Sequence, residues 1–372
     1  MSHFVFTGGG TAGHVVPALP VMAVLRRNGH RVTFIGSNSG YEARLVSAAA
    51  DRFIGVPAGK LRRYWSWQNL RDVLFVLAGI VASLWHLGRL RPQAVFSKGG
   101  FVSLPVVLAA WCWRVPVIVH ESDTSPGLAN RLAYPFTRTL CVNFPIAAEQ
   151  LGFRGPVVHV GTPLRDALLH GDAVRGRTRL DLSAERPLVL VTGGSLGADR
   201  LNEVVLTAAP ELTQRVFLVH ICGPGKCPPV TEWPVGYEAF EFLTEDWGDV
   251  LAAADLVVSR AGANTLFELL ALRKPHILVP LSAAVSRGDQ IENARYSEAQ
   301  GYSRLLDDDS LNSGVLIETI DGELATLDDR RRAMQAFTVP PATELIVELL
   351  LEAAGEAVAG PGTRPKQTKD KP

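Results

Sequence analysis

The sequence is poor in cysteine, carries no excess charge of either sign and has no uncharged apolar run long enough to span a bilayer. Its four cysteines, Cys112, Cys141, Cys222 and Cys227, lack both the C-x-x-C spacing of many metal sites and the density of a disulfide-stapled domain. Lysine plus arginine equals aspartate plus glutamate, at 37 residues each, so no overall field would attract nucleic acid. We expect a protein of a reducing compartment with no nucleic-acid partner.

The longest uncharged apolar stretch, residues 73–88, is shorter than the roughly 20 residues of a membrane-spanning helix. The N-terminal residues MSHFVFTGGG also lack the basic start and apolar core of a signal peptide. Basic and tryptophan side chains lie around the apolar stretch: Lys60, Arg62, Arg63, Trp65, Trp67, Arg71, Trp85, Arg89 and Arg91. Such borders suit anionic headgroups, so residues 61–91 are predicted to touch a membrane surface. A helix buried between strands is the alternative.

Short β-branched runs alternate with helical patterns along the whole chain. The predicted strands are residues 3–7, 31–36, 93–97, 116–120, 138–142, 157–160, 187–192, 215–221, 255–259 and 276–280. Their side chains are continuously apolar, which is typical of strands buried on both faces and separated by helices. The predicted fold class is therefore α/β, with doubly wound parallel sheets.

One local design occurs twice, about half a chain apart. FVFTGGGTAG leads into a helix predicted over residues 15–27, and LVLVTGGSLGAD leads into one predicted over 201–209. We predict two Rossmann-like domains, residues 1–163 and 164–340, divided near Pro163. A helix over residues 341–355 is expected to pack back on the first domain, and the Pro-, Gly- and Lys-rich residues 356–372 are expected to be a disordered tail.

Both glycine-rich loops follow a strand and precede a helix, where backbone amides and the helix dipole attract phosphate. Gly8, Gly10 and Gly13 also fit the G-x-G-x-x-G pattern of dinucleotide sites, which is a weak signal alone. A dinucleotide site needs an acid at the end of the second strand, and residues 35–37 contain none. A tight turn is the alternative for either loop alone, but a third glycine pair, Gly99 and Gly100, favours phosphate binding.

Polar residues also follow two strands of the second half. Arg260 comes directly after the strand at 255–259, and Glu268 lies about two turns into the next helix, where a carboxylate could bind ribose hydroxyls. The loop after the strand at 276–280 carries Asp289 and Gln290. Ligands bind at such strand ends in α/β sheets. A solvated glutamate and a helix N-cap at Asp289 are the alternatives.

Six motifs in order carry a resemblance to a known family: TGGGTAGHVVPAL, FSKGGFVSLP, HESDTSPGLANRLA, GTPLRDALL, GGSLGADRLNE and SRAGANTLFELLAL. Over roughly residues 3–352 the chain resembles the MurG-type peptidoglycan transferases of glycosyltransferase family 28. The resemblance implies a GT-B fold, two Rossmann-like domains with the active site in an interdomain cleft. It also implies an inverting transfer of N-acetylglucosamine from UDP-GlcNAc to the C4 hydroxyl of MurNAc in lipid I, forming lipid II.

The resemblance implies where each substrate binds. The undecaprenyl-linked acceptor is expected in the N-terminal half, and the enzyme is expected to be peripheral on the anionic inner face of the cytoplasmic membrane. Thr11, Ala12 and Gly13 would face the cleft, Arg165 matches a cleft arginine, and Ser195 would reach the donor diphosphate. No metal and no cofactor is expected.

The donor nucleoside and sugar would be held by three further segments. Leu243 stands where the family presents backbone to uracil, and Gln290 corresponds to a glutamine that recognises sugar hydroxyls. The donor helix places Glu268 on the ribose and consists of Ala263, Asn264, Thr265, Leu266, Phe267 and Glu268. Many members have asparagine at the position of Asp123, so that residue has no transferred role.

The attacking hydroxyl needs a proton acceptor, and His14 is the candidate because imidazole titrates near working pH. A capping or packing role for His14 is the alternative, and Glu121 and Asp123 are further candidate bases. Residues 307–309 are three consecutive aspartates that resemble metal ligands of another transferase class. They follow a further strand, predicted over residues 302–306, and precede Ser310, so we expect a helix start there. A transferase for diacylglycerol or another lipid and a non-catalytic sugar-nucleotide-binding protein remain alternative functions.

Overall fold

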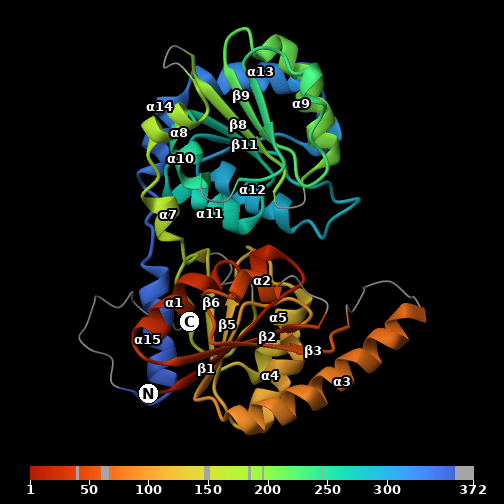
Figure 1. The fold of residues 1–372 in the computed structure, drawn as a ribbon, viewed down its shortest axis with the longest axis vertical. Coiled ribbons are helices and arrows are strands. Elements are labelled where there is room, and N and C mark those ends of the chain that lie inside the picture. The colour runs from red at the N-terminus through yellow and green to blue at the C-terminus, as the bar shows by residue number, and fades with distance from the viewer. Residues whose placement is uncertain are drawn as a thin grey trace. The chain divides into compact units, whose positions relative to one another are not determined.

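The computed structural model describes residues 1–38, 42–59, 67–145, 151–182, 186–194, 197–243 and 246–356, without the side chains of residues 67–71 and of Glu232. The chain forms two compact units (Figure 1). The first unit contains residues 1–164 and the segment from residue 340 onward, and the second contains residues 165–339. The tail predicted to be disordered lies outside the described residues except for Glu356.

The first unit is built on a parallel sheet of seven strands in the order β3-β2-β1-β4-β5-β6-β7. The strands are β1 (His3–Thr7), β2 (Arg31–Ser37), β3 (Arg52–Val56), β4 (Ala94–Ser97), β5 (Val117–Glu121), β6 (Thr139–Val142) and β7 (Val157–His159). Its helices are α1 (Ala18–Arg27), α2 (Glu42–Val46), α3 (Trp67–Leu90), α4 (Ser103–Cys112), α5 (Leu128–Ala133) and α15 (Ala342–Ala353), with the 3-10 helices η1 (Ala12–His14) and η2 (Tyr134–Phe136).

Apolar layers cover both faces of this sheet, because successive side chains of a strand point to opposite faces. Phe4 and Phe6 lie in the layer that includes α1 and α15, to which α15 contributes the buried Leu350. Val5 lies in the opposite layer with Val106 of α4. The last described helix is therefore part of the core of the first unit, next to α1 in Figure 1.

The second unit has a parallel sheet of six strands in the order β10-β9-β8-β11-β12-β13. The strands are β8 (Leu188–Thr192), β9 (Phe217–Ile221), β10 (Tyr237–Phe240), β11 (Leu256–Ser259), β12 (His276–Leu278) and β13 (Arg304–Leu305). The helices are α7 (Asp166–Leu169), α8 (Ala173–Arg179), α9 (Asp199–Leu212), α10 (Trp247–Ala253), α11 (Ala263–Ala271), α12 (Asp289–Ala299), α13 (Ser313–Leu324) and α14 (Leu327–Met334), with η3 (Val230–Glu232) and η4 (Asp308–Ser310).

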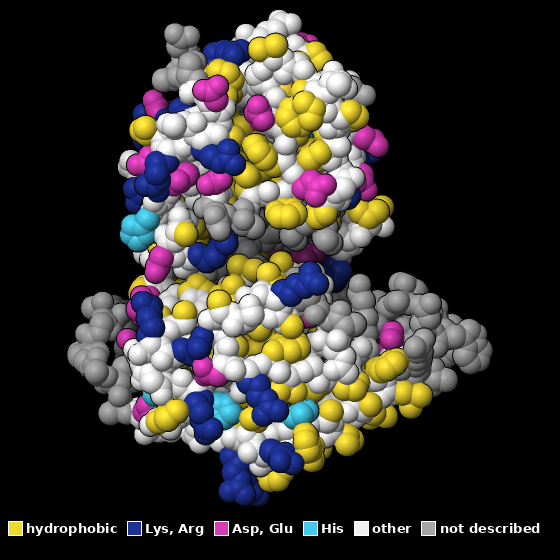
Figure 2. All heavy atoms as spheres, in the orientation of Figure 1, with side chains coloured by type: hydrophobic (Ala, Val, Ile, Leu, Met, Phe, Trp, Pro, Cys, Tyr) yellow, Lys and Arg dark blue, Asp and Glu magenta, His cyan; other side chains and the backbone are white. Residues whose placement is uncertain are grey.

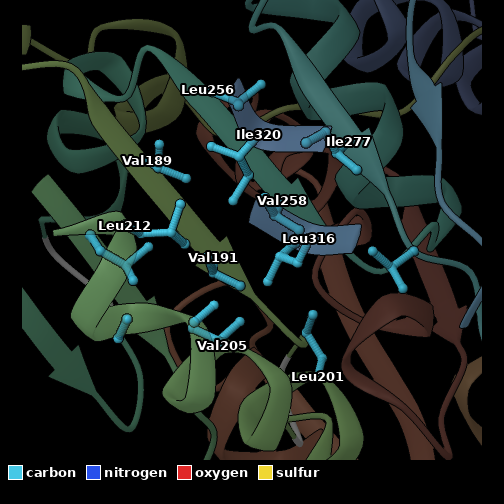
Figure 3. Close-up of a cluster of buried hydrophobic side chains, with 14 of the residues drawn as sticks. Val189, Val191, Leu201, Val205, Leu212, Leu256, Val258, Ile277, Leu316 and Ile320 are labelled. Atoms are coloured by element: carbon cyan, nitrogen blue, oxygen red, sulfur yellow. The ribbon is translucent and has the colours of Figure 1, made fainter. Parts of the chain in front are cut away.

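One core cluster joins this sheet to the helices on one of its faces (Figure 3). Val189 of β8 and Val258 of β11 come from neighbouring central strands. Val205 of α9 and the pair Leu316 and Ile320 of α13 belong to the same cluster. Two doubly wound parallel sheets, as predicted, thus organise the described chain.

Two helix boundaries differ from the predictions. The helix predicted over residues 15–27 begins at Ala18, because Pro17 has no amide hydrogen and disfavours the α conformation of the residue before it. The helix predicted over 201–209 runs from Asp199 to Leu212 with Pro210 inside it. Leu212 is fully buried in the core cluster, so packing holds the last turn beyond the proline.

Strands β3 and β10 were not predicted, and both lie at sheet edges. In β10 the buried Tyr237 and Ala239 alternate with the half-buried Glu238 and Phe240. An edge strand does not need the continuously apolar pattern that marks the central strands. The sequence of β10 therefore lacks the continuous apolar run that predicts the other strands.

Candidate active site

In each sheet the chain leaves a central strand in one direction and later returns on its other side. In the first unit β1 has β2 on one side and β4 on the other, and in the second unit β8 has β9 on one side and β11 on the other. Loops diverge at such a switch point and leave a crevice at the carboxyl ends of the strands, where α/β sheets bind ligands. The predicted glycine loops follow β1 and β8, so each lies at its own switch point.

The first glycine loop is close-packed against its neighbours. A side chain at Gly8 would come within 2.2 Å of the His14 carbonyl oxygen, and one at Gly10 within 2.6 Å of the Phe101 ring. Gly10 also has a φ of +88°, a conformation that other residues rarely adopt. Close approach and backbone conformation both require glycine here.

His14 ends η1 and is half-buried. Its Nδ1 atom lies 3.0 Å from the Gly9 carbonyl oxygen. A carbonyl oxygen can only accept, so Nδ1 carries the proton in this contact and Nε2 carries the lone pair. This tautomer leaves Nε2 as the nitrogen able to accept a proton.

The helix dipole at this loop is weaker than the sequence analysis expects. Helix α1 begins at Ala18, after the whole loop and η1, and a three-residue 3-10 helix has almost no dipole of its own. Thr11, Ala12 and Gly13 lie on the turn before α1, and none of them is in a helix N-terminus of useful length. Any anion at this loop would have to be held by local amides and side chains.

A buried acid that the sequence analysis missed touches the same loop. The Gly10 amide donates to Glu42 Oε1 at 3.2 Å, and the Ser37 hydroxyl donates to Glu42 Oε2, also at 3.2 Å. Glu42 is fully buried on α2, a few residues beyond the end of β2. It is therefore an acid near the end of the second strand, although residues 35–37 contain none. Its carboxylate occupies one loop amide, so the first loop offers fewer donors to a phosphate than its sequence implies.

Lys98 follows β4 and lies at the same switch point. It is 2% exposed, and its Nζ donates to the Ser122 hydroxyl. Burial lowers the pKa of the Lys98 amine from 10.5 to about 8, and the negative charges of Glu121 and Asp123 partly oppose this change. The glycine pair after Lys98 is also required: a side chain at Gly100 would lie 2.1 Å from the Gly9 carbonyl oxygen.

Glu121 organises the loop after β5. Its Oε1 accepts the amides of Ser122 at 2.9 Å and Asp123 at 3.2 Å. Its Oε2 accepts the Gly127 amide at 3.0 Å and the Asn130 side-chain amide at 2.9 Å. A buried carboxylate with four donors stabilises the loop, and this arrangement argues against Glu121 as a general base. Asp123 is half-buried in the same loop.

The second glycine loop, unlike the first, leads directly into a long α-helix. Gly194 and Gly197 have φ values of +83° and +68°, and a side chain at Gly197 would come within 1.9 Å of the Cys222 carbonyl oxygen. Helix α9 begins at Asp199, directly after the loop, and continues for 14 residues. Amides and a helix dipole therefore act together here. Ser195, predicted to reach the diphosphate, lies outside the described residues.

A chain of buried hydrogen bonds through Asn202 and His220 holds the segment against which this loop packs. Asn202 Nδ2 donates to the Cys222 carbonyl oxygen at 2.8 Å, and Asn202 Oδ1 lies 3.0 Å from His220 Nε2. The other ring nitrogen of His220 lies 2.9 Å from the Tyr237 hydroxyl. Burial lowers the pKa of His220 to about 4, so the ring is neutral and donates through Nε2. Asn202 stands in the GGSLGADRLNE motif, but only the fold reveals its role.

The donor helix of the prediction is α11, which follows β11. Ala263, Leu266 and Phe267 are buried, and the polar residues Asn264, Thr265 and Glu268 are only half-buried. Burial raises the pKa of the Glu268 carboxyl to about 7, and the Arg165 guanidinium opposes the shift. The fold thus brings the two predicted residues Arg165 and Glu268 within electrostatic range of each other.

The remaining predicted donor residues lie on two loops. Gln290 is at the start of α12, and its Oε1 accepts the Leu281 amide at 3.1 Å, which fixes the loop after β12. Leu243 is half-buried in the loop after β10, at the edge of the sheet and away from the switch point. Gln290 and the α11 residues follow adjacent strands, whereas Leu243 does not follow either of them.

The aspartates at residues 307–309 form a helix start, as predicted. Asp307 caps η4 by accepting the Asp309 amide. Asp308 is buried and pairs with Arg260 at 2.8 Å, and Arg260 also donates to the Val279 carbonyl oxygen at 3.1 Å. Arg260 therefore ties the loops after β11, β12 and β13 together. Among the described residues, no three His, Cys, Asp or Glu side chains are grouped to hold a metal ion.

Helix α3 carries an exposed apolar surface on the side away from its buried residues Gly79, Ser83 and Leu87. Four apolar side chains recur at helical spacing and are each more than half exposed: Leu74, Leu77, Val81 and Trp85. In the most apolar part of the stretch Asp72–Leu90, only 17% of the residues are buried. By length and composition alone this stretch of 19 residues could also cross a membrane, so the prediction that it is too short to do so is wrong. The alternative of a helix buried between strands is therefore wrong for most of the described side chains, although Leu87 belongs to a core layer of the sheet. In Figure 2 apolar side chains gather along the edge of the first unit where α3 runs in Figure 1.

Aromatic and basic groups border this surface. The Arg89 guanidinium lies 4.8 Å from the centre of the Trp85 ring, and Trp111 and Trp113 of the α4 end are more than half exposed. Trp113 Nε1 donates to the Leu84 carbonyl oxygen at 2.9 Å, which joins the end of α4 to α3. The basic and tryptophan residues predicted at 60–66 lie outside the described residues, and so do the side chains of Trp67 and Arg71.

Family matches cover most of the chain. Residues 4–142 match the glycosyltransferase family 28 N-terminal domain, and residues 188–348 match the glycosyltransferase family 28 C-terminal domain. The chain belongs to glycosyltransferase family 28. Each match contains one switch point with its glycine loop, so the two loops are the corresponding parts of the two family 28 domains.

Curated relatives of this family 28 chain share nearly its whole length. A protein of Legionella pneumophila (strain Paris) is 42% identical over 350 residues, covering 94% of this chain and 96% of its own. One from Bacillus cereus is 38% identical over 353 residues, covering 95% of this chain and 100% of its own. Both are named UDP-N-acetylglucosamine–N-acetylmuramyl-(pentapeptide) pyrophosphoryl-undecaprenol N-acetylglucosamine transferase, and the Bacillus protein is numbered 2.

Solved structures share the fold. MurG of Acinetobacter baumannii superposes with a TM-score of 0.72 at 24% identity, covering 95% of this chain and 100% of its own. A UDP-GlcNAc 2-epimerase of Neisseria meningitidis reaches 0.66 at 16% identity, covering 95% and 100%. The chain has a GT-B fold of two Rossmann-like domains. A transferase and an epimerase both superpose on it, so the fold alone does not separate these two activities.

The buried Lys98 of this family 28 chain gives a testable pH dependence. Its pKa is lowered from 10.5 to about 8, so folding disfavours the charged amine and stability should rise as pH increases from about 8 to 10.5. Relative to Lys98→Met, the wild type should gain at most about 3 kcal/mol of unfolding free energy over this range. Urea unfolding of both proteins at several pH values measures the difference. A difference that is constant with pH would contradict the assignment.

Proposed function

We propose that this chain is an inverting N-acetylglucosaminyltransferase that moves GlcNAc from UDP-GlcNAc to the C4 hydroxyl of MurNAc in lipid I, forming lipid II for peptidoglycan synthesis. The observation that carries the proposal is the near full-length identity of 42% and 38% to relatives named for this transfer. A glycine loop at the switch point of each family 28 domain supports it.

The second unit, in this proposal, binds the donor. The loop from Gly193 to Gly197 and the N-terminus of α9 hold the diphosphate, with Ser195 on the loop. Arg165 adds a positive charge where the leaving UDP develops negative charge. Along α11, the polar side chains Asn264 and Thr265 lie toward the donor, and Glu268 takes the ribose hydroxyls.

The other donor contacts follow from the same arrangement. Gln290 binds sugar hydroxyls while its Oε1 stays on the Leu281 amide, so its amide nitrogen is the group that faces the sugar. Leu243 presents backbone to uracil. None of these contacts requires a metal or another cofactor.

The first unit, in this proposal, binds the acceptor and supplies the base. The residues Thr11, Ala12 and Gly13 present backbone to the acceptor. His14 Nε2 takes the proton of the C4 hydroxyl while the new bond to the anomeric carbon forms and the bond from that carbon to UDP breaks. The contact from Nδ1 to the Gly9 carbonyl oxygen keeps the ring in the tautomer that this step needs.

We also propose that the enzyme is peripheral on the anionic inner face of the cytoplasmic membrane. The acceptor lipid stays in the bilayer, and the apolar surface of α3 supports contact with it. Leu74, Leu77 and Val81 would enter the headgroup boundary, and Arg89 beside Trp85 would remain at the anionic surface.

The transfer itself tests the proposed function. Purified protein is incubated with radiolabelled UDP-GlcNAc and either a lipid I analogue or diacylglycerol, and label is expected in the lipid I analogue alone. Replacing His14 by Ala should lower kcat by roughly 10²- to 10⁴-fold, because the base is lost, with UDP-GlcNAc binding unchanged. Unchanged turnover in this variant would refute the base assignment, and label only in diacylglycerol would refute the acceptor.

The Glu268 carboxyl makes donor binding depend on pH. Its pKa is about 7 in the free protein. Ribose hydroxyls that donate to it favour the carboxylate, so UDP-GlcNAc binding at pH 7 should release about half a proton and should weaken as pH falls below 7. UDP-GlcNAc is the probe because, unlike UDP, it has no terminal phosphate that titrates in this range. Calorimetry in two buffers of different ionisation enthalpy counts the proton. Glu268→Gln should release none, and equal release by both proteins would contradict the ribose contact.

The membrane contact is tested on α3. Leu74→Asp should abolish sedimentation with anionic vesicles, because it places a charge in the apolar surface, and should leave UDP binding unchanged. Leu169→Asp, an exposed leucine of the second unit, is the matched control and should sediment like the wild type. Equal sedimentation of the Leu74 variant and the wild type would refute the contact.

A further inference from the structure

A small apolar pocket in the first unit lies beside the first glycine loop. It is lined by Val76 of α3, by Phe101 and Leu104 at the start of α4, and by Leu128, Ala129 and Leu132 of α5. It holds about 50 Å³, which is room for a few water-sized groups and therefore for a short hydrocarbon segment. These side chains carry no hydrogen-bonding group, so the pocket suits a hydrocarbon.

The pocket shares a wall with the glycine loop. The Phe101 ring is the group that a side chain at Gly10 would meet at 2.6 Å, so the ring lies directly against that loop. Helix α5, which supplies three lining residues, also touches the other glycine segment: a side chain at Gly99 would come within 2.8 Å of Asn130 Oδ1. A group bound at the loop would therefore have the pocket next to it.

The opposite side of the pocket leads to the apolar surface of α3. Leu132 lines the pocket and is 42% exposed. On α3, Val73 and Leu77 flank the lining residue Val76 and are exposed. The first glycine loop, the pocket and the apolar surface of α3 thus lie next to one another in the first unit.

We propose that this pocket binds the first isoprene unit of the acceptor's polyprenyl diphosphate. The inference rests on the proposed function, since it assumes a lipid-linked acceptor with its diphosphate near the first glycine loop. A diphosphate there has its lipid carbons beside Phe101, and the rest of the chain continues along α3 into the bilayer. Burial of the branched hydrocarbon supplies affinity that the loop, with its Gly10 amide on Glu42, does not supply alone.

Binding of farnesyl diphosphate, compared with inorganic diphosphate, tests the pocket without membrane or detergent. The full chain should bind farnesyl diphosphate at least roughly tenfold more tightly, because buried CH₂ groups add affinity. Ala129→Phe fills the pocket and should remove this preference. Ala78→Phe makes the same change at an exposed position of α3 and should keep it. Equal affinity of the wild type for both probes, or an unchanged preference in a folded Ala129 variant, overturns the proposal.

A second variant and a second readout keep the test decisive. If circular dichroism shows that Ala129→Phe is unfolded, Leu132→Lys replaces it, since this change puts a charge at the exposed rim and should also remove the preference. In the transfer assay, Ala129→Phe should raise KM for a farnesyl-linked acceptor and leave KM for UDP-GlcNAc unchanged. Transfer with equal acceptor KM in both proteins refutes the pocket alone, whereas no transfer by the wild type to any lipid-linked muramyl peptide refutes the proposed function.

Discussion

The parallel direction of the strands is the constraint on which the candidate site depends. Because every strand of a sheet runs the same way, all carboxyl ends lie along one edge, and residues distant in sequence meet there. Lys98, Glu121 and the first glycine loop come together for this reason alone, as do Arg260 and the loops after β12 and β13. The order of the strands then decides where the loops diverge, and in both units they diverge after the strand that carries the glycines.

Two similar glycine loops differ in what they can bind. The second loop ends in a 14-residue helix and is supported by Asn202 and His220, so its amides and the helix dipole point to one place. The first loop is followed by a 3-10 turn and a proline, and a buried glutamate already takes one of its amides. This asymmetry fits a division in which the second loop holds the charged leaving group and the first loop positions the acceptor and the base.

The sequence predicted the architecture well because buried parallel strands leave an unambiguous mark: ten apolar runs correspond to ten of the strands. It failed where a contact depends on the fold rather than on a pattern. Glu42 reaches the first loop only because α2 follows β2, and the exposure of α3 depends on the absence of a covering layer among the described residues. The polar side chains of α11 show the same limit, since helical periodicity indicates which residues are buried but not what the others face.

The position of α15 has a consequence for how the chain is made. Its Ile346, Val347 and Leu350 complete the apolar layer over Phe4 and Phe6, yet they are synthesised last. On the ribosome the second unit has its whole sequence available first, whereas the first unit waits with part of its core uncovered until residue 350 has emerged. The second unit can thus complete its core before the first, although it comes later in the sequence, and a nascent chain stalled before α15 would expose the apolar surface that α1 and α15 share.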